Sequence, residues 1–287
     1  MSNEVFLKRN TENKVPDEIQ MPQAVKQALS GQIQSKYPTE TYELPSKGYF
    51  YPEDSVLSKG VLEFKMMTAQ EEDILTSQKL IRNGTAITKV IEKLLVTPGV
   101  KLDDLLLSDF NSIVYFIRRM AYGNHYGPFA VVCDECGEKS SNEHVDLSQF
   151  ECKDINFSLF ERGVNSFPFV LPYANRSITF KLLTHGDSKK IDTEINSLQK
   201  MSRYGIASNI TTRLKYTITS IDGKSDLASI AKFVTTEMVS RDSVALRNYI
   251  RDITPELDTT FNFTCPQCGA VTRMELPMTA EFFWPSR

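Results

Sequence analysis

The sequence lacks the features that would place a protein in a membrane or on the secretory route. Apolar residues make up 41% of the 287 residues, but no apolar run approaches the ~18 residues needed to span a bilayer. The opening residues MSNEVFLKRNTENKV are polar and mixed in charge, so we expect no signal peptide. A net charge of −3 provides no global basic field for nucleic acid or an anionic membrane. We therefore expect a globular protein of a reducing cytoplasm.

Motifs of common active sites are also missing. There is no glycine-rich phosphate loop and no G-x-S-x-G nucleophile elbow. No H-E-x-x-H motif includes any of the three histidines, which are His125, His144 and His185. The acid pairs Glu71–Glu72 and Asp103–Asp104 stand at predicted helix starts, where carboxylates favour the helix dipole, and we expect them to be solvated. These absences argue against an enzyme, including a cell-wall hydrolase, which needs two carboxylates in a cleft.

Composition divides the chain into an arm and two halves. Residues 1–40 carry few large apolar side chains, and we expect a polar N-terminal arm that orders only against a partner. Residues 41–150 are predicted to form a turn-rich and helical half that ends in a first C-x-x-C pair. Residues 151–287 are predicted to form an α+β half that ends in a second C-x-x-C pair and an aromatic C-terminus.

Local patterns predict an α+β fold of mixed helices and short antiparallel hairpins. Thr68 can cap a helix that begins at Ala69, because Glu71 follows three residues later as in a capping box. Apolar spacing favours further helices, and runs of β-prone residues favour strands. The predicted helices lie within 86–96, 109–123, 187–201 and 241–253, a strand spans 61–66, and a hairpin spans 167–183.

Four of the five cysteines form two C-x-x-C-G motifs. The motifs consist of Cys133, Cys136 and Gly137, and of Cys265, Cys268 and Gly269. A β-prone run stands before and after each motif, as in the two arms of a zinc ribbon. Each motif presents two thiolates, and two motifs together complete a tetrahedral zinc site. We predict one structural Zn²⁺ ion held by the four cysteines, although 128 residues, 137–264, separate the two pairs.

Other uses of these cysteines remain open. The same spacing suits a rubredoxin-like iron site, and metal-free cysteines are a further alternative. A redox C-x-x-C is disfavoured because neither motif stands at a strand-to-helix junction. His144 is near enough to the first motif to be a reserve ligand. Cys152 has no partner, and we expect it to be a buried apolar residue.

The end of the chain concentrates three adjacent aromatic residues, Phe282, Phe283 and Trp284. Left in water they would form an exposed adhesive patch. One extended strand cannot bury all three on a single face. We expect Phe282 and Trp284 to pack on the protein while Phe283 points elsewhere; in the alternative, part of the cluster inserts into a neighbouring protein.

Several segments, taken together, resemble the baseplate hub assembly family of T-even-like, contractile-tailed bacteriophages. They are ELPSKGYFYP, VLEFKMMTAQEEDILTSQKLI, ITFKLLTHGDSKKI, TTRLKYTITSIDG, RDSVALRNYIRDI and FFWP, and they extend from Leu44 to Pro285. The resemblance implies a structural or assembly component of the central hub, without catalytic residues. It implies a place in the virion tail baseplate, assembled in the host cytoplasm. Its partners would be other hub, wedge or tail proteins, and a homo-oligomer is possible.

A zinc-ribbon adaptor for nucleic acid is the alternative function. Such an adaptor would need basic and aromatic side chains around the cysteines. The flanks CDECGEKSSNEHVD and CPQCGAVTRMEL do not supply them. We therefore expect contacts with proteins and none with nucleic acid or membrane.

Overall fold

The computed structural model describes residues 38–201, 208–276 and 280–283. Most of the predicted arm, residues 1–37, lies outside them. The α-helices are α2 (Ala69–Thr76), α3 (Gln78–Arg82), α4 (Ala86–Leu94), α5 (Leu107–Tyr122), α6 (His185–Met201), α7 (Asn209–Thr217), α8 (Leu227–Lys232) and α9 (Ser240–Ile253). Short helical turns are η1 (Val56–Lys59), η2 (Leu102–Asp104), η3 (Leu147–Gln149), η4 (Phe157–Leu159), the π-helix η5 (Phe233–Glu237) and η6 (Ala280–Phe283).

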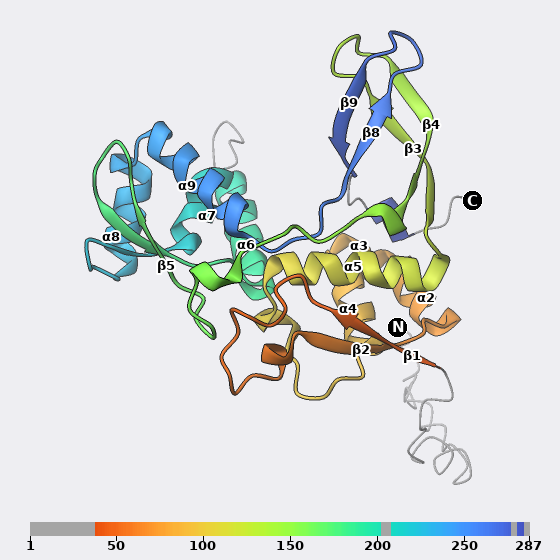
Figure 1. Ribbon diagram of the computed structural model, residues 1–287, viewed down its shortest axis with the longest axis horizontal. Coiled ribbons are helices and arrows are strands. Elements are labelled where there is room, and N and C mark those ends of the chain that lie inside the picture. The colour runs from red at the N-terminus through yellow and green to blue at the C-terminus, as the bar shows by residue number, and fades with distance from the viewer. Residues whose placement is uncertain (1–37, 202–207, 277–279, 284–287) are drawn as a thin grey trace, which may run out of the picture. The chain divides into compact units, whose positions relative to one another are not determined.

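The strands form small antiparallel sheets, which confirms the predicted α+β class. The strands are β1 (Thr39–Glu43), β2 (Val61–Lys65), β3 (His125–Val132), β4 (Lys139–Asp146), β5 (Phe167–Val170), β6 (Ser177–Phe180), β7 (Ile218–Ile221), β8 (Thr260–Thr264) and β9 (Val271–Glu275). β1 pairs with β2, β3 with β4 and β8 with β9, while β5, β6 and β7 form one sheet. Figure 1 shows the hairpins β3–β4 and β8–β9 side by side.

Helix α5 is the longest described helix in the first half of the chain, and Figure 1 shows it in yellow. The helix predicted within 109–123 is confirmed, and one of its faces is apolar: Ile113 and Ile117 are fully buried and Phe116 is packed against the same core. Phe116 stacks on Tyr42 of β1 with ring centroids 4.5 Å apart. The helix ends at Gly123, whose backbone N–H bonds the carbonyl of Arg119.

The LPSKG segment is fastened to the start of α5 by a buried carboxylate. Asp109 accepts hydrogen bonds from the backbone N–H of Ser46 at 3.0 Å and from the Ser46 hydroxyl at 2.6 Å. The hydroxyl of Tyr51 donates a third bond at 2.6 Å. Desolvation by burial raises the pKa of Asp109 to about 6, against the lowering effect of these bonds. A buried acid satisfied by three donors therefore fixes this turn.

The start of α2 confirms the predicted helix start, but Glu71 is not solvated. Its carboxylate accepts bonds from the backbone N–H of Thr68 at 3.0 Å and from the Thr68 hydroxyl at 2.6 Å. Lys65 on β2 forms an ion pair with it at 3.2 Å. These partners compensate for removing the charge from water, so the side chain is buried while Glu72 stays exposed.

The last described segment corrects the expectation for the terminal aromatics. Phe282 and Phe283 are both buried, because they lie on the short helix η6 and not on an extended strand. Their rings meet edge to face, with centroids 5.7 Å apart. Arg118 of α5, itself buried, donates from Nε to the carbonyl of Phe282 at 2.8 Å. Trp284 lies outside the described residues.

Candidate metal centre

Two equivalent loops carry the four cysteines at the ends of the hairpins β3–β4 and β8–β9. In the first loop the N–H of Cys133 bonds the carbonyl of Glu138 at 2.8 Å, and the N–H of Gly137 bonds the carbonyl of Cys133 at 2.9 Å. In the second loop the same two bonds recur in the same order. They join Cys265 to Ala270 at 2.8 Å and Gly269 to Cys265 at 3.0 Å.

The glycine of each loop is required by its backbone conformation. Gly137 has φ 74° and Gly269 has φ 72°, in the left-handed region that residues with a Cβ rarely adopt. An added Cβ would meet no atom within 4 Å at either position, so the requirement comes from φ and not from crowding. The glycine of the C-x-x-C-G pattern therefore allows the chain to adopt this turn.

The fold brings the four sulfur atoms together within 4.8 Å of one another. Cys133 Sγ lies 3.8 Å from Cys268 Sγ, and Cys136 Sγ lies 3.6 Å from Cys265 Sγ. Four thiolates around one zinc ion with Zn–S bonds of ~2.3 Å would be about 3.8 Å apart at tetrahedral angles. Disulfide bonds would require ~2.05 Å. The spacing fits a four-coordinate metal site and does not fit disulfides.

The local surroundings shift the pKa values of the thiols in opposite directions, raising that of Cys136 to about 12 and also that of Cys268, and lowering that of Cys265. The backbone N–H of Cys268, aimed at the Cys265 sulfur, lowers the pKa of that thiol to about 7 against the opposing effect of desolvation. The first cysteine of each pair is buried, and the second is exposed. A set of four sulfur donors suits zinc or iron and leaves no coordination position for a substrate.

The expectation for Cys152 is corrected, and the structure also places His144. Cys152 is exposed, and it pairs with Leu257 in an isolated antiparallel β-bridge. His144 is not a member of the cysteine cluster. Its ring stacks on His125 across the β3–β4 hairpin, with His125 Nε2 and His144 Nδ1 3.1 Å apart.

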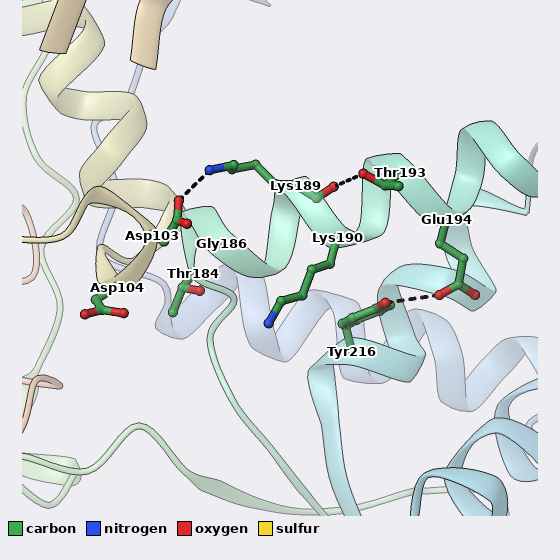
Figure 2. Close-up of a pocket in the computed structure, with 9 residues that line it drawn as sticks. All are labelled: Asp103, Asp104, Thr184, Gly186, Lys189, Lys190, Thr193, Glu194 and Tyr216. Atoms are coloured by element: carbon green, nitrogen blue, oxygen red, sulfur yellow. Dashed lines mark hydrogen bonds and ion pairs between the residues drawn. The ribbon is translucent and has the colours of Figure 1, made fainter. Parts of the chain in front are cut away.

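A second concave surface lies between η2, α6 and α7 and is drawn in Figure 2. Lys189 forms an ion pair with Asp103 at 2.7 Å, which joins α6 to η2. Glu194 accepts a hydrogen bond from the Tyr216 hydroxyl at 3.1 Å and forms an ion pair with Lys215, which joins α6 to α7. These charged side chains therefore link helices to one another. The sequence patterns did not reveal this surface, because its residues come from three separate segments.

In the described part of the chain, no helix is both long and apolar enough to cross a membrane.

Fold and site together define a class: an α+β protein in which one cysteine cluster joins the middle of the chain to its end. The model of one protein family, described as T4 bacteriophage base plate protein, matches residues 36–284. The chain therefore belongs to the family of T4 bacteriophage base plate proteins. It is a structural component of a phage tail baseplate, which brings it into contact with other tail proteins. Neither the curated proteins nor the solved structures contain a significant match.

Proposed function

We propose that this protein is a component or assembly factor of the central hub of the baseplate. It acts through protein contacts without catalysis, and a structural zinc ion is held by Cys133, Cys136, Cys265 and Cys268. The family match over residues 36–284 is the observation that carries the baseplate role. The finer hub assignment is supported by the resemblance of segments such as LPSKG and FFWP to hub assembly proteins.

The zinc proposal is supported by the agreement between the sulfur spacing and a tetrahedral site. Four protein thiolates leave zinc without an open position, so the ion would stabilise the fold and would not bind substrate. Elemental analysis of the purified, reduced protein should find one zinc per chain. Iron in place of zinc, or no metal in a fully reduced sample, would contradict this assignment.

The hub assignment has its own test, which does not depend on the metal. Cross-linking and mass spectrometry of purified phage particles should recover this chain joined to proteins of the central hub. Cross-links to peripheral wedge proteins alone would overturn the hub role and leave the baseplate family intact. Absence from finished particles, together with cross-links to the hub in assembly intermediates, would identify a transient assembly factor.

The nucleic-acid alternative finds no support at the cysteine loops. Asp134, Glu135 and Glu138 of the first loop are all exposed. Three carboxylates beside a zinc ion held by four thiolates would repel phosphate groups. A DNA-binding assay at moderate salt should therefore show no retention.

A further inference from the structure

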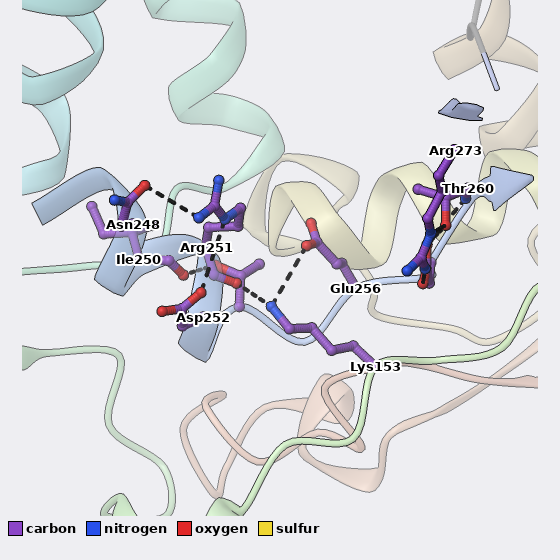
Figure 3. Close-up of polar contacts among 10 residues, drawn as sticks. Lys153, Asn248, Ile250, Arg251, Asp252, Glu256, Thr260 and Arg273 are labelled. Atoms are coloured by element: carbon purple, nitrogen blue, oxygen red, sulfur yellow. Dashed lines mark hydrogen bonds and ion pairs between the residues drawn. The ribbon is translucent and has the colours of Figure 1, made fainter. Parts of the chain in front are cut away.

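One exposed face of α9 combines arginine side chains with an apolar centre. Val244 is 45% exposed, and Arg241 and Arg247 stand three residues before and after it, on neighbouring positions of the same helix face. Arg251 lies two turns beyond Val244 on this face and is also exposed. Figure 3 shows its side chain bonded to Asn248. No ion pair between described residues includes Arg241 or Arg247.

The turn between β5 and β6 extends this surface. Asp242, which is fully buried, accepts hydrogen bonds from the backbone N–H of Tyr173 at 2.8 Å and of Ala174 at 3.0 Å. These bonds hold Tyr173, 66% exposed, beside the start of α9. Tyr173, Val239 and Arg241 line one open hollow. We define the α9 surface by five residues: Tyr173, Val239, Arg241, Val244 and Arg247.

The cysteine loops present a surface of opposite charge. Asp134, Glu135 and Glu138 are exposed on the first loop, and no ion pair between described residues includes them. Val132, at the end of β3, and Val271, at the start of β9, flank the cysteine cluster and are 52% and 68% exposed. We call these five residues the ribbon tip. The ribbon tip and the α9 surface are both exposed in one chain, so neither covers the other.

We propose that the ribbon tip of one copy of this chain docks on the α9 surface of a second copy. Acidic side chains around exposed valines would then meet arginines around Val244 and Tyr173. The contact would pair opposite charges and would remove the exposed apolar side chains from water. The charge of residues 38–287 is divided in a similar way, since the acidic residues of the ribbon tip lie in the first of two ranges and the arginines of α9 in the second. Residues 38–160 contain 12 Lys and Arg against 19 Asp and Glu, whereas residues 161–287 contain 16 against 13.

The contact joins two different surfaces and is therefore heterologous. Pairing either surface with its own counterpart on a second copy would place like charges against each other, which is unfavourable. In a head-to-tail pair one copy keeps an unused α9 surface and the other keeps an unused ribbon tip, so copies add until a ring closes or a filament grows. The inference does not rest on the hub role or on the identity of the metal.

Sedimentation velocity on the full-length protein, with its metal content measured, tests the proposal. Wild type should form species larger than a monomer at protein concentrations up to about 100 μM. This corresponds to a dissociation constant between the micromolar and millimolar ranges. Association should weaken when NaCl is raised from 0.05 to 0.5 M, a range that roughly brackets physiological ionic strength, because salt screens the attraction between the two surfaces. The variants D134K/E135K and R241E/R247E should each associate at least about tenfold more weakly.

Mixing the two variants gives the sharpest outcome. D134K/E135K keeps an intact α9 surface and R241E/R247E keeps an intact ribbon tip, so the two variants should bind each other. The reversed surfaces also match, because the introduced lysines would face the introduced glutamates, so the mixture should regain the association of wild type although each variant alone associates weakly. A matched control is K59E/K93E, which changes the net charge as R241E/R247E does but replaces exposed lysines outside both surfaces. It should associate like wild type.

Three results would overturn the proposal: a wild type that is monomeric throughout, variants that associate like wild type, or a mixture that stays monomeric. Binding of a different baseplate protein to the α9 surface, with a monomeric wild type, would overturn it as well. If D134K/E135K unfolds at a lower temperature than wild type, V271S replaces it, because Val271 lies outside the loop between the cysteines. V271S should then associate with itself more weakly than wild type, because its ribbon tip loses apolar area, and its intact α9 surface should still bind the ribbon tip of R241E/R247E.

Discussion

Replacing Phe282 by alanine tests whether the terminal aromatics belong to the core. The Phe282 side chain is fully buried, and its ring contacts three others. The centroid distances are 4.9 Å to Tyr115, 5.0 Å to Tyr126 and 5.7 Å to Phe283. Truncation leaves a cavity among these rings, and for a buried phenylalanine the loss of unfolding free energy is about 3–5 kcal/mol. The hydrogen bond from Arg118 to residue 282 survives, because it uses the backbone carbonyl.

Thermal and urea unfolding of purified F282A measure the effect. For a chain of this size a loss of 1 kcal/mol lowers the Tm by roughly 2 °C, so we expect a decrease of about 6–10 °C. L159A is the control, because Leu159 is 74% exposed and its truncation should change the unfolding free energy by less than about 0.5 kcal/mol. If F282A unfolds like wild type and fails to join the baseplate, the segment is an anchor for a neighbour and the core assignment is wrong.

Two further changes probe the cysteine cluster and the buried acid. C265S should lose the metal. When free zinc is 1,000 times its dissociation constant from wild type, this loss should lower the unfolding free energy by about 4 kcal/mol. C152S should match wild type, because Cys152 is exposed and lies outside the cluster. Equal melting temperatures for both would contradict the shared site. Burial raises the pKa of Asp109 from 3.8 to about 6. As the pH rises between these two values, the unfolded chain releases the proton more readily than the folded protein, so the stability of wild type should fall relative to that of D109N. Above about pH 6 the difference should stay constant. Urea unfolding of both proteins from pH 4 to 7 measures this difference, and parallel curves would refute it.

Local chemistry was sufficient to predict many of the elements. The capping pair Thr68 and Glu71 indicated where α2 begins, and apolar spacing indicated α5 and α9. The C-x-x-C-G pattern accounts for both turns, because a left-handed glycine at the fifth position depends on neighbours in sequence alone. The resemblance of short segments also indicated the family, which the match over residues 36–284 confirms.

The environment of several charged and aromatic side chains could not be predicted in this way. Glu71 was expected in water, but β2 brings Lys65 against it, and the side chain is buried. Arg118 is buried because the chain returns 164 positions later and places the Phe282 carbonyl at its Nε. Cys152 was expected to be buried, and it is exposed.

The sequence by itself determined the turns, the helix starts and the four residues able to hold a metal, since each depends on groups a few positions apart. Only the tertiary structure decided that the two cysteine pairs meet. Cys136 and Cys265 are 129 positions apart, and their sulfurs come within 3.6 Å because the hairpins that carry them lie side by side. Burial and long-range pairing depend on which distant segments share the core, and no local pattern encodes that choice.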